Sequence, residues 1–418
     1  MGKFWKKGVS ALVVILVLTE LLLFSYHIQE TEEESQPENE GKEAAQLTLW
    51  YSDENMGYYF TEAAKAYEQD TGIKVTARQV SGVDYIEQIN KASISETGGP
   101  DLYMSGSDIL EKAHLAGLAS ENQFASQLYN SEHYPQIALD AVTYKGVQVA
   151  YPLSFETSCL LYNKAYAAEA PATIDDILTF SDTFEGGEGI ENIFVWNVSD
   201  IFSDYFFAGN YINLGGPCGD DKVQIDINNE QVQQAMAYYQ SLKEFFALDP
   251  ETISDEDVIQ DFMDGKTIYA IVRADDLNKM EAAASVGLTT VDYGVARVPD
   301  LTESLQTKPL AVTSVVVVNG YTPYPKEAAD FAKYLTYDYA VNLYSMVNRM
   351  SARSDLNLDK PHVDTLKEIY QTAAGVPKIM ELSNYWIQME VTFANIWQGA
   401  DVPGELQKVS DLITKQLK

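Results

Sequence analysis

The sequence is poor in cysteine and histidine. It contains two cysteines, Cys159 and Cys218, and four histidines in 418 residues. Two thiols so far apart cannot build a disulfide scaffold, and with so few histidines they cannot build a metal cluster. Cys159 lies in an apolar run and is expected to be a small buried side chain. The low cysteine content fits either a cytosol or a Gram-positive-type cell surface.

Basic residues are also scarce. The chain has 28 lysines and arginines against 62 acidic residues, which gives a net charge of -34. Such a surface repels nucleic acid, so a nucleic-acid partner is excluded. The main expected effect of this acidity is to keep the protein soluble. The alternative explanation is that the acidic residues bind a cationic ligand. Hydrophobic residues make up 46% of the chain, which is enough for a packed core, and the length favours two lobes over one.

Sequence patterns of common enzymes are missing. The chain has no Gly-x-Ser-x-Gly, His-Glu-x-x-His or phosphate-loop pattern, and the DGKT segment at 264–267 is better explained as a turn before a strand. A glycosidase needs only two carboxyl groups about 5–9 Å apart, a separation that a sequence does not fix. The prediction is a binding protein without catalytic residues, cofactor or metal.

The first 28 residues are typical of a secretory signal or a membrane anchor. Three lysines within the first seven residues precede the largely apolar stretch 8–28, which as a helix would span roughly 31 Å. Glu20 interrupts this stretch, and no Ala-x-Ala-like cleavage site follows Phe24. There is no cysteine near the end of this stretch, so a lipid cannot be attached there. An uncleaved anchor is therefore favoured over a cleaved signal, with everything after Ile28 outside the cell.

An acidic linker is expected next, at residues 29–46. It contains seven glutamates, one proline and one glycine, and few apolar residues. Charge of a single sign keeps such a segment extended and solvated. The linker would hold the folded part away from the envelope.

Strands and helices alternate from Leu47 onward. Strands are predicted at 47–51, 73–77, 101–104, 193–196, 268–272 and 312–318, and helices at 59–71, 85–95, 232–246, 255–264 and 326–335. This alternation predicts an α/β fold with mainly parallel sheets flanked by helices. Parallel sheets bind ligands at the carboxyl ends of their strands, which points to the loops after Tyr51 and Met104.

Several segments, in order, match a known family along nearly all of residues 47–418. They are LTLWYS, FTEAAKAYEQDTGIKV, GGPDLYMSGSDILEKAHLAGLA, DAVTYKGVQVAYPLSFETSCLLYNK, FMDGKTIYAIV, YGVARVPDL, AVTSVVVVNG with PKEAADFAKYL, and NYWIQMEVTFANIWQGADVPGELQKVSDLI. On these segments the chain resembles the maltose-binding-like solute receptors of ATP-driven (ABC) sugar importers, in the extracellular solute-binding protein family 1.

The resemblance implies a two-lobed periplasmic-binding-protein fold of class II type. The first lobe would take residues 47–155 and 306–351, and the second lobe residues 157–305 and 352–418. Chain crossings would fall near Phe155-Glu156, Leu305-Gln306 and Met350-Ser351. The lobes would close on a carbohydrate, and the closed form would be recognised by the permease subunits of the importer.

Two strong candidates for sugar contact come from the resemblance. Glu156 matches a glutamate that binds sugar hydroxyls, and Trp386 matches a stacking tryptophan, with Tyr385 as its neighbour. A flat ring covers the apolar face of a sugar, while a carboxylate accepts two hydroxyl bonds. The alternative for Glu156 is a buried structural partner, and for the rings it is the core.

Polar residues after two first-lobe strands are further candidates. Glu54 and Asn55 follow the first strand, where the family places a polar pair, and Ser105 and Asp108 follow the strand ending at Met104. Ser105 replaces a tryptophan of the maltose-binding pattern.

Second-lobe candidates are Trp196, Asn197, Asp200, Arg273 and Asp275. Asp200 matches a family carboxylate. The segment from Arg273 to Asp275 replaces a stacking tryptophan. With two platforms for a maltose-like chain missing, a more polar, charged or shorter saccharide is expected, although Arg273 and Asp275 could also form a surface ion pair.

Two other binding roles remain open on the sequence. A receptor held by an uncleaved anchor could report its ligand to a membrane sensor instead of an importer. The acidity also permits a cationic solute such as a polyamine, because aromatic and carboxylate side chains suit both ligands.

Overall fold

The computed structural model describes residues 45–95, 98–360 and 362–418. The predicted anchor at 1–28 and nearly all of the predicted linker at 29–46 lie outside these residues. Among the described helices, none is both long enough and apolar enough to cross a membrane. Residues Gln46–Lys418 form one compact unit.

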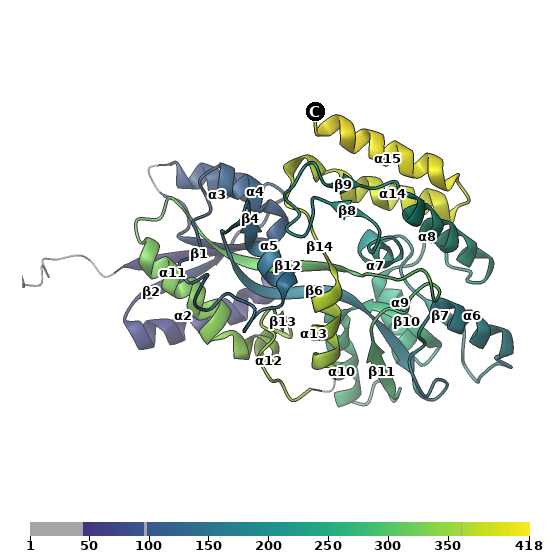
Figure 1. The fold of residues 1–418 in the computed structure, drawn as a ribbon. Helices are drawn as coiled ribbons and strands as arrows, with labels where there is room; N and C mark the ends of the chain where they lie inside the picture. The colour runs from purple at the N-terminus through teal and green to yellow at the C-terminus, as the bar shows by residue number, and fades with distance from the viewer. Residues whose placement is uncertain (1–44, 96–97, 361) are drawn as a thin grey trace, which may run out of the picture. The chain divides into compact units, whose positions relative to one another are not determined.

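A ten-stranded sheet runs through this unit (Figure 1). Its main path has the order β2-β1-β3-β12-β6-β10-β7. The strands are β1 (Gln46–Tyr51), β2 (Lys74–Gln79), β3 (Leu102–Gly106), β6 (Tyr151–Asn163), β7 (Asn192–Val195), β10 (Thr267–Arg273) and β12 (Leu310–Val318). Strands β1 to β3 belong to the first lobe, and β7 and β10 to the second.

Two long strands, β6 and β12, connect the lobes. The first half of β6, residues 151–157, pairs with β12, and its second half pairs with β10 and with β11 (Tyr293–Ala296). Two short strands join them at the crossing: β13 (Met350–Ser351) pairs with β6, and β14 (Ala374–Gly375) pairs with β12. Strands β6 and β12 each run through both lobes without a break. The predicted lobe boundaries, which fall within or beside these strands, therefore stay a prediction.

The expectation of mainly parallel sheets is wrong. Parallel pairing is found for β1 with β2 and β3, for β10 with β7, and for β12 with β14. The pairs β12–β3, β12–β6, β10–β6, β11–β6 and β13–β6 are antiparallel. The reason is the crossing itself: β6 leads from the first lobe into the second and β12 leads back, so the two run in opposite directions.

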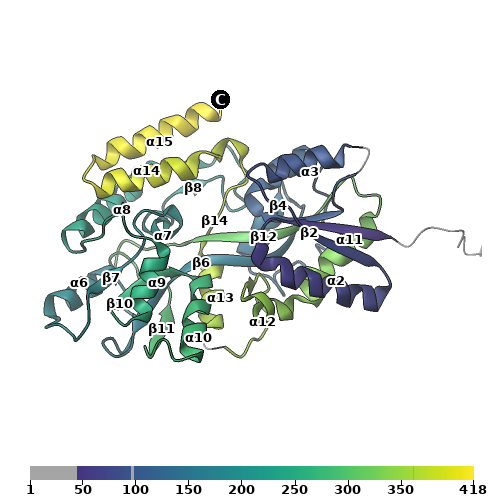
Figure 2. The same cartoon turned by 180° about the vertical axis from the view of Figure 1, so that it is seen from behind.

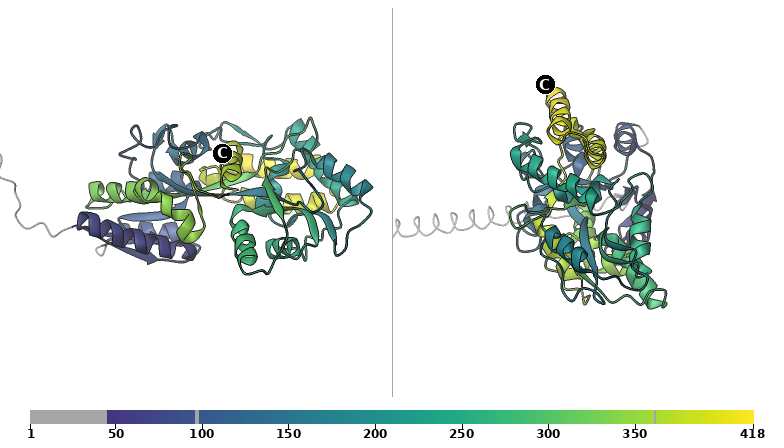
Figure 3. Two further views of the ribbon diagram at one scale, coloured as in Figure 1. Left: turned by 90° about the horizontal axis from the view of Figure 1, so that it is seen from below. Right: turned by 90° about the vertical axis from the view of Figure 1, so that its right-hand side faces the viewer.

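Helices cover both faces of the sheet in the first lobe (Figure 3). The helices are α2 (Gly57–Thr71), α3 (Tyr85–Ser93), α4 (Leu110–Leu115), α5 (Gln136–Val142), α11 (Pro325–Lys333) and α12 (Leu343–Val347). Along β12, Val316 and Val318 pack with α2 and α11, while Val315 and Val317 pack with α3 and α4. Successive side chains of a strand point to opposite faces, which explains how one run of valines serves two cores.

The second lobe repeats this layering. The helices α6 (Ile174–Thr183), α7 (Ile201–Asp204), α8 (Glu230–Ser241), α14 (Tyr385–Trp397) and α15 (Val402–Gln416) share one core with the sheet, and α9 (Asp255–Met263) and α10 (Leu277–Ser285) pack on the other face. Helix α13 (Val363–Thr372) packs beside β6 at the crossing. Two further antiparallel pairs form separate two-stranded sheets. They are β4 (Thr143–Tyr144) with β5 (Val147–Gln148), and β8 (Asn213–Leu214) with β9 (Ile225–Asp226).

The strands and helices predicted from local signals in the sequence match elements of the structure, whereas the long strand β6 and the helices α13 to α15 were not predicted. Helix α2 ends at Gly72, which adopts φ +75° as a left-handed C-terminal cap. The predicted helix at 326–335 is α11, which passes into one π-helical turn at Tyr334–Asp338. Cys159 is fully buried, which confirms its expected role as a small core side chain.

Candidate functional site

A cavity of about 450 Å³ lies where the two lobes face each other beside the crossing strands. The first lobe lines it with Asn55 and Tyr58, the second lobe with Asp275 and Asn278, and the segment before β13 with Arg349. Figure 2 shows α2, α12 and α10 on this side of β6 and β12. Because both lobes contribute walls, the cavity is in the place where lobe closure would enclose a ligand.

Arg349 links the lobes at this cavity. Its Nη2 lies 3.0 Å from Oδ2 of Asp53, which follows β1, and its Nη1 forms an ion pair with Asp275, which follows β10. Nη1 also lies 3.6 Å from Oε2 of Glu156 in β6. We call Asp53, Glu156, Asp275 and Arg349 the cleft cluster. One guanidinium therefore faces three carboxyl groups drawn from both lobes and the crossing strand.

Glu156 has a carboxyl oxygen without a hydrogen-bond partner among the described residues. Oε1 accepts from the backbone N of Thr157 at 2.9 Å, whereas Oε2 is shielded from solvent and accepts no hydrogen bond, with Nη1 of Arg349 3.6 Å away. Burial raises the pKa of Glu156 to about 7, and the nearby guanidinium groups of Arg349 and Arg273 only partly oppose that rise. A buried unpaired carboxyl oxygen is costly. Glu156 is therefore suited to accept a hydrogen bond from a ligand.

The raised pKa of Glu156 predicts a dependence of stability on pH. Because the folded protein holds the proton more tightly than the unfolded chain, Glu156 favours folding below about pH 4.5, and this contribution is lost as the pH rises through about 7. Glu156→Gln cannot titrate. Between pH 5 and pH 8 the wild type should lose about 1–3 kcal/mol of unfolding free energy relative to the variant, measured by urea denaturation.

The control for this experiment is Glu303→Gln, which changes an exposed glutamate outside the site. Its pH dependence should match that of the wild type. Parallel pH profiles of the wild type and Glu156→Gln would show that Glu156 titrates normally and is solvated.

A second ion-pair group lies in the second lobe. Arg273 at the end of β10 places Nη2 2.7 Å from Oδ2 of Asp200 and Nε 3.0 Å from Oδ2 of Asp255, and its guanidinium lies 4.7 Å from the ring centre of Phe202. Asn197 extends the group, since its Nδ2 donates to Asp255 at 2.9 Å. Asp200 also caps α7 by accepting from the backbone N of Ser203. These contacts fix the loop after β7 next to the end of β10.

Most of the first-lobe candidates do not line the cavity. Asp53 accepts from the backbone N of Asn55 and so shapes the 3-10 turn Glu54–Met56, in which Glu54 and Asn55 are exposed. Ser105 is half-buried near the end of β3. Asp108 is exposed, yet desolvation by the surrounding protein raises the pKa of its carboxyl. Of these residues, Asn55 lines the cavity.

The three aromatic candidates differ in exposure. Trp386 is half-buried at the start of α14, with its ring centre 5.5 Å from that of Tyr205. Tyr385 and Trp196 have no exposed surface and belong to the core of the second lobe. Nε1 of Trp196 donates to the buried Asp204 at 2.8 Å. Part of the Trp386 side chain therefore stays exposed, whereas Tyr385 and Trp196 pack inside the lobe.

Three charged members of the site were absent from the sequence-based candidates: Asp53, Asp255 and Arg349. Asp53 directly precedes Glu54, and Arg349 directly precedes the predicted crossing at Met350-Ser351, so both positions carried a signal. Asp255 begins α9 and becomes part of the site only by packing against Arg273. Arg273 and Asp275 pair with other residues rather than with each other.

Comparisons with known proteins agree with this architecture. Residues 62–375 match the model of the bacterial extracellular solute-binding protein family. The chain is 23% identical over 344 residues to a maltodextrin-binding protein of Bacillus subtilis, an alignment that covers 77% of this chain and 78% of that protein. It is 27% identical over 313 residues to a maltooligosaccharide ABC transporter solute-binding lipoprotein of Streptococcus pneumoniae, with 72% and 69% covered.

Solved structures share the fold. The extracellular solute-binding protein of Staphylococcus aureus, solved in complex with maltose, superimposes with a TM-score of 0.77 at 22% identity and covers 90% of this chain and 98% of that one. MalX of Streptococcus pneumoniae, in complex with maltopentaose, gives 0.69 at 21% identity, with 88% and 99% covered. The fold is thus the two-lobed α/β fold of solute-binding proteins. The chain belongs to the bacterial extracellular solute-binding protein family, a family of binding receptors.

Proposed function

We propose that this protein is an extracytoplasmic carbohydrate receptor that delivers an oligosaccharide to an ABC importer. The support is a polar cavity between the two lobes, with guanidinium and carboxyl groups that can form paired hydrogen bonds to hydroxyls. The half-buried Trp386 is the candidate for ring stacking, and it packs beside Tyr205 outside the lining of this cavity. The names of the Bacillus and Streptococcus relatives point to the same ligand class and to the same kind of importer.

The single observation that carries the proposal is that the buried Oε2 of Glu156 accepts no hydrogen bond. It lies in the strand that crosses between the lobes, beside a guanidinium that both lobes share. A sugar hydroxyl donating to this oxygen would remove the cost of the unpaired group. That gain is available only when a ligand occupies the cavity, so ligand binding would favour the closed arrangement.

Asn55, Asp275 and Arg349 line the cavity. The proposed ligand set contains these three residues and the other candidates whose side chains are exposed or half-buried. They are Glu156, Trp386, Asn55, Glu54, Ser105, Asp108, Asp200, Arg273, Asp275 and the added Asp53 and Arg349. Asn197 acts through Asp255, and Trp196 and Tyr385 act as packing residues. No residue of this set is assigned a catalytic step, and the saccharide would leave unchanged, which an assay for new reducing ends tests.

The proposed location is the outer face of the cell membrane. The apolar segment 8–28 and the acidic segment 29–46 would serve as anchor and spacer, and the permease subunits of the importer would be the protein partners. Membrane fractionation of the full chain and of a chain starting at residue 44 tests the anchor. Recovery of both chains in the soluble fraction would reject it.

Saccharide binding should weaken when the acceptor or the ring is removed. Glu156→Ala and Trp386→Ala should each lower the affinity for a bound maltodextrin by about 1–3 kcal/mol, because a charged hydrogen bond or a stacking contact is lost. Calorimetry with maltose and longer maltodextrins measures this loss. Unchanged affinity in both variants, while the wild type binds, would place the sugar elsewhere.

The controls for this experiment are Glu303→Ala and Trp50→Ala. Both keep the residue types of the test variants but lie outside the cavity. Their affinities should equal that of the wild type.

A polyamine is the second candidate ligand, and one observation favours it. In the two ion-pair groups, five carboxyl groups face two guanidinium groups. The excess negative charge would attract an ammonium group. Titration with spermidine alongside the saccharides separates the two candidates: heat from spermidine alone would replace the carbohydrate proposal.

A further inference from the structure

A second cavity, of about 390 Å³, lies on the opposite side of the crossing strands. We call it the junction cavity. Its walls come from α5 of the first lobe, from residues 205–219 of the second lobe, and from the connecting residues Lys308 and Gln371 to Gly375. Figure 1 shows α5, α13 and β14 in front of β6 and β12. The junction cavity shares no lining residue with the cavity beside Arg349, which we call the saccharide cavity.

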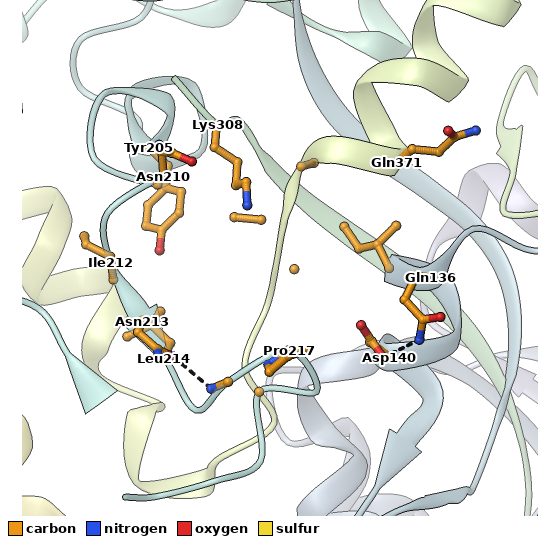
Figure 4. Close-up of a pocket in the computed structure, with 17 residues that line it drawn as sticks. Gln136, Asp140, Tyr205, Asn210, Ile212, Asn213, Leu214, Pro217, Lys308 and Gln371 are labelled. Atoms are coloured by element: carbon orange, nitrogen blue, oxygen red, sulfur yellow. Dashed lines mark hydrogen bonds between the residues drawn. The ribbon is translucent and has the colours of Figure 1, made fainter. Parts of the chain in front are cut away.

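Lys308 is the distinctive residue of this cavity. It is half-buried, and its ammonium has neither an ion pair nor a hydrogen bond with any described residue. Figure 4 shows the side chain reaching into the space between Tyr205 and Asp140. The chain has 62 acidic and 28 basic residues, yet no carboxylate pairs with this ammonium among the described residues.

One further charged residue lines the cavity. Asp140 is the one acidic residue among the described lining residues, and its Oδ1 accepts from Nε2 of Gln136 at 2.8 Å. The ammonium of the buried Lys378 lies beside it and donates to the Asp140 carbonyl at 2.9 Å. The Asp140 carboxylate also attracts this ammonium without forming an ion pair with it, so the ammonium groups of Lys308 and Lys378 stand against the single lining carboxylate of the described residues.

We propose that the junction cavity is a second binding site, for a small molecule that carries a carboxylate or phosphate group. The ammonium of Lys308 supplies the counter-charge, and the amide groups of Asn210 and Gln136 lie in the same lining. A charged hydrogen bond to an oxyanion is stronger than a neutral one, and the volume is that of an ordinary small-molecule pocket. Since both lobes and their connections form the walls, an occupant would also be linked to the lobe arrangement.

The test is calorimetric titration of the whole protein with inorganic phosphate and with citrate, at constant ionic strength set with chloride. Saturable binding of either anion is expected, and it should weaken about tenfold or more in Lys308→Gln. Binding of phosphate alone or of citrate alone identifies the group that is preferred. Lys308→Arg should restore binding, and Lys243→Gln, which changes an exposed lysine of the same lobe, should leave it unchanged.

Three results would overturn the proposal. They are the absence of saturable binding for both anions, equal affinity in the wild type and Lys308→Gln, and a loss that follows Arg273→Gln rather than Lys308→Gln, which would place the anion at the guanidinium groups of the saccharide cavity. Thermal unfolding of each variant verifies that it is folded. Saccharide titrations run in parallel keep this result separate from the carbohydrate proposal.

Discussion

Trp196→Ala should lower the unfolding free energy by about 3–5 kcal/mol, the usual cost of removing a buried tryptophan. The side chain is fully buried, with ring centres of Phe194 and Trp397 at 4.9 and 5.6 Å. Its loss also removes the 2.8 Å hydrogen bond to Asp204, a buried carboxyl whose pKa is raised by burial. Urea denaturation followed by circular dichroism measures the change.

Two further variants separate packing from ligand contact. Trp50→Ala removes a half-buried tryptophan that lies under Arg78 in the first lobe, and should cost about 1 kcal/mol. Trp196→Phe keeps most of the packing and should leave saccharide affinity unchanged. If Trp196→Phe abolished saccharide binding while stability stayed near that of the wild type, Trp196 would belong to the ligand site after all.

Arg349→Ala should destabilise the protein by about 2–4 kcal/mol at pH 8, because it leaves three carboxyl groups around a partly buried site without their cation. One fifth of the Arg349 side chain is exposed, which keeps the effect below that of a fully buried pair. Loss of this guanidinium should also raise the pKa of Glu156 further, since Arg349 opposes the effect of burial.

The pH dependence identifies the cause of this loss. At pH 5 the carboxyl group of Glu156 is protonated and adds no repulsion, so the difference between Arg349→Ala and the wild type should shrink. Arg78→Ala, at an exposed arginine, should cost about 0.5 kcal/mol or less at both pH values. Equal destabilisation by Arg349→Ala at pH 5 and pH 8 would indicate lost packing rather than unpaired charge.

Much of the fold could be predicted from the sequence because its signals are local. Apolar residues at helical spacing followed by Gly72 fix α2 and its end, and valines at 315–318 fix a strand that is covered on both faces. The direction in which the strands pair, parallel or antiparallel, could not be predicted from local signals. The chain crosses between lobes along β6 and returns along β12, and nothing in the alternation of strands and helices reveals the direction of a crossing.

The candidate site divides in the same way. Glu156 ends an apolar run at a predicted crossing, so its unusual position could be noticed in the sequence. The partners of Arg349 could not: Asp53 and Asp275 are separated from it by 296 and 74 positions, and only packing brings them together. Trp196 follows a strand as a ligand-binding tryptophan would, and its burial depends on α8 and α14 folding over it.

The sequence by itself determined the α/β composition, the family resemblance and the acidic character of the chain, because each depends on residue type and near-neighbour spacing. Tertiary structure alone decided which charges meet, which tryptophan stays partly exposed, and that Lys308 has no carboxylate partner, because those outcomes depend on contacts between segments far apart in the chain.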